Sequence, residues 1–351
     1  MTTDAAQGTK PGARMRGEIA EQPERWQALL DQEGAHLREL RGRIRSRPPR
    51  LVLFVARGTS DHAALYGSYL VQTSLGLPAA SASPSVVTLY RGRLTLQDVL
   101  VVAVSQSGES PDLASFVEMA RHNGATTMAL TNAPDSALSR ATHETVDLRA
   151  GRESAVAATK SYTAELLALA ALFAPDAIDK VLPRLPELGR QVLDASASPA
   201  TELATVYRFA TRVVTAARGY SSASAQETAL KFMETSYISA HGMSSADLLH
   251  GPVAMLDESV PLLCFASSGP DAPELAALVE RGRRRGVDVD VVGDGTVAGR
   301  RLPPLLPTSV PAELRPLLEI LPAQLLAAEI AVERGFDPDA PRGLSKVTKT
   351  Y

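Results

Sequence analysis

Two short segments of the sequence crowd hydroxyl and amide side chains directly behind strand-like runs. SQSGES at 105–110 follows the β-branched run 99–104, and RGTS at 57–60 follows the apolar run 51–55. Helical spacing resumes after each segment, so each is predicted to be a turn from a strand into a helix. Free backbone N–H groups at a helix start, with added hydroxyl donors, suit the binding of a phosphate. The side-chain donors are Thr59, Ser60, Ser105, Gln106, Ser107 and Ser110.

Helix capping is the alternative explanation for these hydroxyls, because serine and threonine are favoured N-cap residues. One helix start needs only one cap, however, and SQSGES supplies several donors at once. Gly108 in the same segment allows the backbone to approach a ligand closely. The crowding therefore favours a phosphate site over capping alone.

A second group of chemically capable residues lies in ETALKFMETSYI at 227–238. Lys231 and Glu234 are three residues apart, so they share one face of the predicted helix. A desolvated carboxylate suits proton transfer between neighbouring carbons of a sugar, whereas the alternative is a surface ion pair. His250, in LLHGP, precedes a Gly-Pro pair that forces a non-helical exit and can present the imidazole to a cleft. The alternative for this histidine is a structural role.

Apolar runs that alternate with helical patterns must position these residues. The alternation indicates parallel sheets built from βαβ units, and therefore an α/β fold. The predicted strands are 51–55, 100–104, 126–130, 145–148, 213–216, 261–265 and 288–292. The predicted helices of the first half lie near 61–75, 111–122 and 134–140.

The two halves of the chain also share local sequence. ARGTS at 56–60 is echoed by ARGYS at 217–221, and SQSGESPDL at 105–113 by the weaker ASSGPDAPEL at 266–275. The two pairs have nearly the same offset, which predicts a duplicated α/β domain. The second copy lacks equivalents of Gln106 and Ser110, so we expect one phosphate site, in the first copy.

Prolines and composition suggest the domain limits. We predict domains at 31–175 and 200–335, joined by a linker at 176–199 that contains Pro183, Pro186 and Pro199. Residues 1–30 are predicted to be an N-terminal extension with a lead-in helix, and 336–351 a C-terminal tail over the active site.

Composition excludes several classes of function. The formal net charge of -3, from 36 basic and 39 acidic residues, gives no field for nucleic acid or an anionic membrane. Cys264 is the only cysteine, and neither metal-ligand spacing nor a dinucleotide glycine motif occurs, so no metal and no cofactor are expected. The N-terminus has no signal-peptide core, and the apolar stretch 166–173 is shorter than the ~20 residues of a membrane span. We expect a cytoplasmic protein.

Several motifs, in the order RGTSDH, SQSGES, RESAVAATKSYT, ETALKFMETSYI, LLHGP and PRGLSKVTKTY, resemble those of the sugar isomerase (SIS) family. They are most similar to the isomerase half of glucosamine-6-phosphate synthases and to stand-alone SIS-type glucosamine-6-phosphate deaminases. The resemblance spans about residues 15–351 and implies two tandem SIS domains, each a parallel sheet between helices. It includes no glutaminase domain, whose starting cysteine the N-terminus lacks, so synthesis from glutamine is not expected.

The resemblance also implies roles for individual residues. The hydroxyl and amide donors of the two turns would bind the 6-phosphate of an amino sugar, Glu234 would be the base, and Lys231 would lie beside the oxygens of the open-chain sugar. His250 would assist ring opening from the neighbouring subunit, which implies a homodimer. Further residues that the resemblance places in the cleft are Lys346, Glu153, Ser154, Thr159 and Lys160, and His62 is expected to pack near the phosphate turn.

Two positions depart from the family pattern or distinguish its branches. Arg57 precedes GTS, where the synthases tend to have cysteine, and this favours the stand-alone branch. Leu249 stands where the family usually has lysine or arginine before HGP. Loss of that cation changes the surroundings of His250. The sequence therefore leaves open which group leaves the substrate.

Three functions remain open from the sequence. The first is isomerising deamination of glucosamine 6-phosphate to fructose 6-phosphate and ammonia, begun by proton transfer between C2 and C1. The second is elimination at C3, the dehydration of N-acetylglucosamine 6-phosphate, which starts from the same carbanion. The third is a non-catalytic sugar-phosphate sensor, but residues 1–45 are too short and too acidic for a DNA-reading module. We place the deaminase ahead of the other two.

Overall fold

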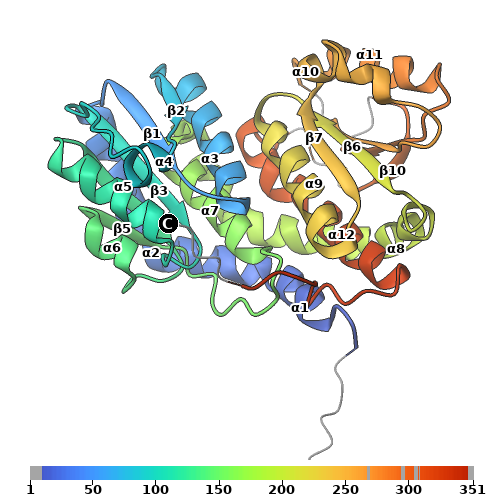
Figure 1. Cartoon of the computed structure of the whole chain (residues 1–351), viewed down its shortest axis with the longest axis horizontal. Coiled ribbons are helices and arrows are strands. Elements are labelled where there is room, and N and C mark those ends of the chain that lie inside the picture. Colours follow the sequence, from blue (N-terminus) through green and yellow to red (C-terminus); the bar gives the residue numbers. More distant parts are fainter. Residues whose placement is uncertain (1–9, 267–268, 294–296, 304–306, 308, 347–351) are drawn as a thin grey trace, which may run out of the picture.

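The computed structural model describes residues 10–266, 269–293, 297–303, 307 and 309–346. These residues form two lobes side by side, each built around a parallel five-stranded sheet with helices on its faces (Figure 1). The α/β fold predicted from the alternating runs is confirmed. Within the described ranges, no helix has both the length and the hydropathy that crossing a membrane requires.

The two sheets have the same strand order. The first contains β1 (Leu51–Val55), β2 (Ala79–Ser81), β3 (Val99–Ser105), β4 (Thr126–Thr131) and β5 (Glu144–Asp147), arranged β2-β1-β3-β4-β5. The second contains β6 (Arg212–Ala217), β7 (Ser239–Ser244), β8 (Leu262–Phe265), β9 (Val289–Val292) and β10 (Arg300–Leu302), arranged β7-β6-β8-β9-β10. Numbered within each lobe, both orders are 2-1-3-4-5, which is common in doubly wound folds.

This equality supports the duplication inferred from the sequence. ARGTS lies at the end of β1, and ARGYS lies at the end of β6, the strand with the same place in the second sheet. The prediction of a duplicated α/β domain is therefore confirmed. The weaker repeat, ASSGPDAPEL after β8, includes residues 267–268, which lie outside the described residues.

Helices connect and cover the strands. Those of the first lobe are α3 (Thr59–Leu70), α4 (Ser85–Thr88), α5 (Pro111–His122), α6 (Ala137–Ala141) and α7 (Lys160–Phe173), with a π turn at Val71–Leu75. Those of the second are α9 (Ser222–Ser236), α10 (Ser245–Leu249), α11 (Ala272–Arg283) and α12 (Arg315–Glu333). The chain enters through α1 (Ala13–Ala20) and α2 (Gln22–Ser46), and α8 (Leu185–Tyr207) joins the lobes. Short 3₁₀ turns lie at 176–180, 182–184, 219–221, 252–255 and 312–314.

One apolar core extends through both lobes. Every residue of α7 is buried, which explains why its sequence is apolar over most of its circumference. This helix contacts α2 and α3 of the first lobe and α12 of the second. The same buried cluster includes Trp26 near the N-terminus and Phe232 on α9. Close packing of this shared core fixes the site-bearing helices relative to one another.

The predicted domain limits at 30 and 199 both fall inside helices. The segment 176–199, predicted as a linker, consists largely of 3₁₀ turns and of α8, which continues to Tyr207. Pro186 lies at the start of α8, where proline is tolerated, and Pro199 lies within the helix rather than ending it. The lobes are thus connected largely by a packed helix and not by an extended segment.

The contact between β7 and α9 leaves no room for a side chain at Gly242. A Cβ there would lie 2.4 Å from the Cα of Gln226 and 2.8 Å from the carbonyl oxygen of Ala225. We expect G242A to lower the free energy of unfolding by about 1–3 kcal/mol, because backbone atoms must shift to accommodate the methyl group. Chemical denaturation of the purified variant measures this loss.

Gly42 on α2 provides the matched control. It is exposed, and a Cβ added there would meet nothing within 4 Å. G42A is expected to raise stability by about 0.5–1 kcal/mol, because alanine favours a helix interior over glycine. Equal stability of G242A and the wild type would contradict the close packing of β7 on α9.

Candidate active site

Each of the two hydroxyl-rich segments is a turn from a strand into a helix, as predicted. RGTS joins β1 to α3, and SQSGES joins β3 to α5. β1 and β3 are adjacent in the sheet, so the turns meet at one edge. Gly108 has φ +62°, and a Cβ on it would lie 2.1 Å from Ser136 Oγ, so this turn requires glycine.

The hydroxyls of these turns do not cap the helices. Neither Gly58 before α3 nor Ser110 before α5 provides a side-chain cap. Ser105 Oγ instead accepts from Gly108 N–H at 3.2 Å, and Ser107 Oγ accepts from Glu109 N–H at 3.3 Å. A serine that accepts these bonds keeps its own proton for a ligand. Capping alone therefore does not account for the crowding of donors.

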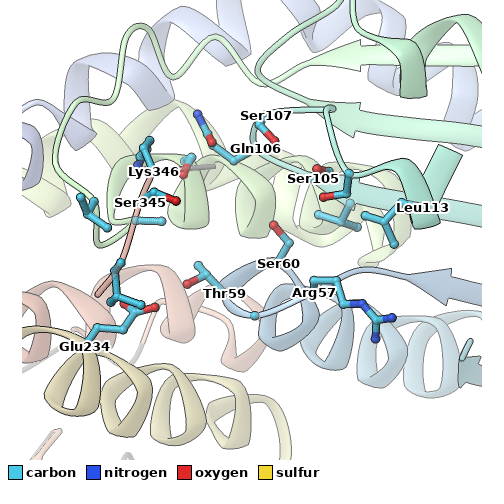
Figure 2. A pocket seen from close by; sticks show the side chains of 17 residues that line it. Arg57, Thr59, Ser60, Ser105, Gln106, Ser107, Leu113, Glu234, Ser345 and Lys346 are labelled. Atoms are coloured by element: carbon cyan, nitrogen blue, oxygen red, sulfur yellow. The ribbon is translucent and has the colours of Figure 1, made fainter. Parts of the chain in front are cut away.

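A cavity of about 340 Å³ opens between the two turns, α9 and the C-terminal tail. Figure 2 shows Ser105, Gln106 and Ser107 on one side of it and Glu234 on the other. Of the predicted site residues, those that line the cavity are Thr59, Ser60, Ser105, Gln106, Ser107, Ser110, Glu234 and Lys346. Lining residues that sequence reasoning did not assign to the site include Arg57, Val156, Ala158, Ser161, Leu344 and Ser345.

Lys231 lies directly behind Glu234 and is almost fully buried. Its Nζ is 2.5 Å from Glu234 Oε2, 3.1 Å from Thr59 Oγ1 and 3.3 Å from Glu227 Oε1. Burial alone would lower the pKa of Lys231, but the two carboxylates outweigh it and raise the pKa above its ordinary value. The pair is therefore not a surface ion pair: a permanent buried cation holds the carboxylate that faces the cavity.

Glu227 is the buried residue that joins the two lobes at the site. It is 0 % exposed, accepts from Thr59 Oγ1 at 3.1 Å and lies 2.8 Å from His62 Nδ1, in addition to its ion pair with Lys231. Glu227 is not among the residues predicted for the site, although it precedes Lys231 by one helical turn. His62 packs near the phosphate turn, as predicted, and its partner is this carboxylate.

The C-terminal tail enters the site through Lys346. Its Nζ lies 2.7 Å from Glu153 Oε2, and Glu153 also accepts from Thr159 N–H and from Ser161 N–H and Oγ–H. Burial by itself would raise the pKa of Glu153, but Lys346 and these hydrogen bonds outweigh it and lower the pKa. Glu153 thus acts as a buried anchor for the tail. The tail is also held at Arg342, which stacks on the Tyr237 ring at 4.1 Å.

Several of the predicted residues do not line the cavity in this chain. Glu153 and Lys231 do not line the cavity but contact the lining residues Lys346 and Glu234, respectively. Thr159 is buried, and its backbone N–H donates to Glu153. His250 follows α10 on an exposed surface, and its predicted arrival from a second subunit remains a prediction. The full set outside the lining is Glu153, Ser154, Thr159, Lys160, Lys231 and His250.

Ser154 and Lys160 belong to a buried contact with the N-terminal helices instead. The backbone N–H of Ser154 donates to Glu18 Oε1, and Lys160 Nζ lies 2.8 Å from Glu21 Oε2. Ser154 follows Glu153 directly, and Lys160 Nζ also donates to the carbonyl oxygen of Arg152, so these contacts hold the segment that anchors the tail. Their role in this chain is to support the wall of the cavity rather than to line it.

No group of histidine, cysteine, aspartate or glutamate side chains that could hold a metal ion occurs within the described part of the chain. The side chains that line the cavity instead offer hydroxyls, an amide, one carboxylate, one ammonium and the Arg57 guanidinium, which is paired with Asp112. Such a donor set suits an anionic, oxygen-rich ligand and proton transfer at its far end.

Comparison with known proteins places this geometry in a family. The SIS domain model matches residues 47–175 and 207–294, one match in each lobe. The glutamine–fructose-6-phosphate aminotransferase (isomerizing) of Methanothermobacter thermautotrophicus is 34 % identical over 305 residues, covering 84 % of this chain and 51 % of that protein. A Thermus thermophilus protein of the same name is 34 % identical over 356 residues, covering 95 % and 58 %. The chain therefore spans about half the length of the curated relatives it matches.

Solved structures extend the comparison. A candidate phosphosugar isomerase from Silicibacter pomeroyi DSS-3 is 38 % identical, with a TM-score of 0.84 over 93 % of this chain and 99 % of that one. A glucosamine-6-phosphate deaminase from Thermotoga maritima, at 22 % identity and a TM-score of 0.76 over 96 % and 100 %, shares the fold. The family model, the relatives and the duplicated 2-1-3-4-5 sheets agree, and the chain belongs to the SIS domain family.

Proposed function

We propose that this protein transfers a proton between C1 and C2 of an amino-sugar 6-phosphate, and that its reaction is the isomerising deamination of glucosamine 6-phosphate. The observation that carries the proposal is a single cavity with a phosphate cradle on one side and the Glu234 carboxylate on the other. A hexose 6-phosphate has the same two ends, a phosphate at C6 and an acidic proton beside the carbonyl carbon.

The phosphate is held by neutral donors in this proposal. Ser105 and Ser107 keep their own protons for the phosphate, Ser60 lines the same cradle, and the positive end of the α5 dipole adjoins it. A helix N-terminus favours an anion without a basic side chain. This explains how a chain of net charge -3 binds a doubly charged substrate.

Glu234 is the general base of the proposed reaction. It removes the proton from C2 of the open-chain aldehyde; the electron pair forms the C1=C2 bond, and the C1 oxygen takes up a proton to give an enolamine. Return of the first proton to C1, with loss of an N–H proton, gives the imine at C2, and water hydrolyses this imine to fructose 6-phosphate and ammonia. Lys231 holds Glu234 in place through their ion pair, while Lys346 approaches the sugar from the tail.

The relatives support this assignment. The curated relatives are named as isomerizing glutamine–fructose-6-phosphate aminotransferases, and the Silicibacter pomeroyi protein as a phosphosugar isomerase. Conversion of glucosamine 6-phosphate to fructose 6-phosphate and ammonia uses the same carbon skeleton and the same proton transfer. Elimination at C3 from the N-acetyl sugar begins at the same C2 proton, so product analysis must separate the two reactions.

The first prediction concerns the phosphate cradle. S107A removes a hydroxyl that lines the cavity. We expect KM for the sugar 6-phosphate to rise roughly 10- to 150-fold, because one hydrogen bond to a charged group is lost. Steady-state kinetics with the phosphorylated sugar and with unphosphorylated glucosamine measure the effect, and only the former should respond.

S198A is the control for this measurement, because Ser198 is exposed on α8 far along the chain from the cradle. It should leave KM unchanged. Equal use of glucosamine and its 6-phosphate by the wild type would rule out the phosphate site.

The second prediction concerns the base and the identity of the reaction. E234Q keeps the shape of the side chain but removes the proton acceptor, so we expect kcat to fall by about 10²- to 10⁴-fold. Each protein is supplied with glucosamine 6-phosphate and with N-acetylglucosamine 6-phosphate, and ammonia, fructose 6-phosphate and ultraviolet-absorbing unsaturated sugar are measured.

The products decide between the candidate functions. Ammonia and fructose 6-phosphate from the free amine would support deamination, and an unsaturated product from the N-acetyl sugar would identify elimination instead. Binding of both sugars without any product would indicate a sensor. Full activity of E234Q on the working substrate would exclude Glu234 as the base.

The third prediction concerns His250, which we propose reaches the cavity of a partner subunit in a homodimer. H250N and E234Q should each be inactive. In a mixed dimer, the H250N subunit keeps Glu234 and receives His250 from its partner, so one complete site forms. Mixing and reassembling the two variants should restore about a quarter of the wild-type activity. No recovery from a verified mixed dimer would mean that His250 acts within its own chain or not at all.

A further inference from the structure

A buried carboxyl group without a role in the proposed chemistry lies behind the phosphate cradle. Glu165, on α7, is 0 % exposed. Its Oε1 accepts from Ser60 Oγ at 2.7 Å, whereas its Oε2 is buried with no hydrogen-bond partner. Ser60 lines the cavity, but Glu165 does not. The carboxyl group therefore reaches the ligand only through the Ser60 hydroxyl.

The surroundings of Glu165 disfavour a negative charge. Within the described residues, no lysine, arginine or histidine forms an ion pair with it. The groups that face it from other elements are Glu153 before α7, Glu227 on α9 and Lys346 in the tail. Lys346 is already bound to Glu153, and the hydroxyls of Tyr162 and Tyr66 lie in the same buried region.

Burial and the neighbouring groups determine the direction in which the pKa of Glu165 shifts. Burial raises the pKa of Glu165 well above its ordinary value; the Ser60 hydrogen bond opposes the shift, and the nearby carboxylates add to it. An ionised carboxylate with one oxygen buried and unpaired would also carry a large desolvation cost. Both the contacts and the burial favour the neutral acid.

The direction of the hydrogen bond between Ser60 and Glu165 depends on whether Glu165 is neutral or ionised. Ser60 has one proton, and a carboxylate accepts hydrogen bonds but donates none. If Glu165 were ionised, it would hold that proton, and Ser60 would turn only lone pairs toward a phosphate. If Glu165 is neutral, its own O–H can donate to Ser60 Oγ. The Ser60 proton is then free to rotate into the cavity.

We propose that Glu165 is a positioning residue for phosphate binding: as a neutral acid it donates to Ser60 Oγ, and Ser60 in turn donates to the 6-phosphate. The proposal rests on the proposed function, because it needs a phosphate beside Ser60. No covalent bond changes in this step: the Ser60 O–H rotates from Glu165 toward the phosphate, and the Glu165 O–H then donates to Ser60 Oγ. The same relay makes the cradle sensitive to alkaline pH.

Two substitutions separate this role from packing. E165L keeps a buried side chain of similar size but cannot donate, so Ser60 Oγ loses the hydrogen bond that orients it and we expect Kd for a sugar 6-phosphate to rise roughly 2- to 12-fold. E165Q has an amide N–H₂ that can donate to Ser60, and it should restore most of that loss. The probe is glucitol 6-phosphate, which has no carbonyl and cannot be turned over, and calorimetry gives its Kd. Thermal melting checks that each variant is folded.

The pH profile provides a readout that packing alone would not change. As pH rises through the raised pKa of Glu165, the wild type loses the donor and gains a negative charge behind the phosphate, so Kd should increase. E165Q does not titrate, so its Kd should stay flat apart from the ionisation of the ligand itself. Measurements from about pH 6 to about pH 10 cover the range in which buried glutamates are known to titrate.

The Ser60 hydroxyl gives the final control. In an S60A background, E165L and E165Q should bind the probe equally, because the relay has lost its middle member. Parallel pH profiles for wild type and E165Q, or an undiminished E165L effect in S60A, would overturn the relay while leaving phosphate binding intact. Failure of the wild type to bind glucitol 6-phosphate, or equal binding of glucitol, would instead overturn the phosphate site and the relay together.

Discussion

The contacts of two buried α9 residues, Glu227 and Lys231, with Thr59 and His62 of α3 hold the two lobes in the geometry that the cavity requires. Glu227 belongs to the second repeat, yet it accepts from Thr59 and contacts His62 in the first. Removing one partner of such a buried pair costs about 3–5 kcal/mol, because an unpaired charge is left in the interior. The same cation positions Glu234, so the assembly of the lobes and the placement of the proposed base depend on one group.

The duplicated fold uses its two copies differently. Both sheets have the same strand order, but only the first copy keeps the full set of donors after its first and third strands. The second copy contributes α9, whose inward face carries Glu227, Lys231 and Glu234. Each copy presents a helix start and a helix face at the same edge of its own sheet. A cavity between the copies can therefore combine a phosphate cradle from one copy with a base from the other.

The central strands and the two turns could be predicted from the sequence because they are local features. β3 is a continuous buried β-branched run, and SQSGES indicates the turn that follows. Edge strands such as β2 and β7 were not predicted, since they are short or polar and gain their order from pairing with β1 and β6. The place of Glu165 and Glu227 at the site could not be predicted either. A glutamate on a helix is usually exposed to solvent, and only the tertiary packing shows that these two are buried.

The cavity that we propose to bind a phosphate is surrounded by carboxyl groups, and the structure compensates each of them in a different way. Glu153 is paired with Lys346, and Glu227 with Lys231 and His62. Glu165 has no such partner among the described residues, and the neutral form is the one left to it. Arg57 also lines the cavity, and its guanidinium forms an ion pair with Asp112 at 2.9 Å. In the proposed function the phosphate is bound by hydroxyls and helix dipoles, and the orientation of each hydroxyl proton then decides whether it attracts or repels the ligand. That dependence is why a buried proton on Glu165 can govern recognition at the surface of the cavity.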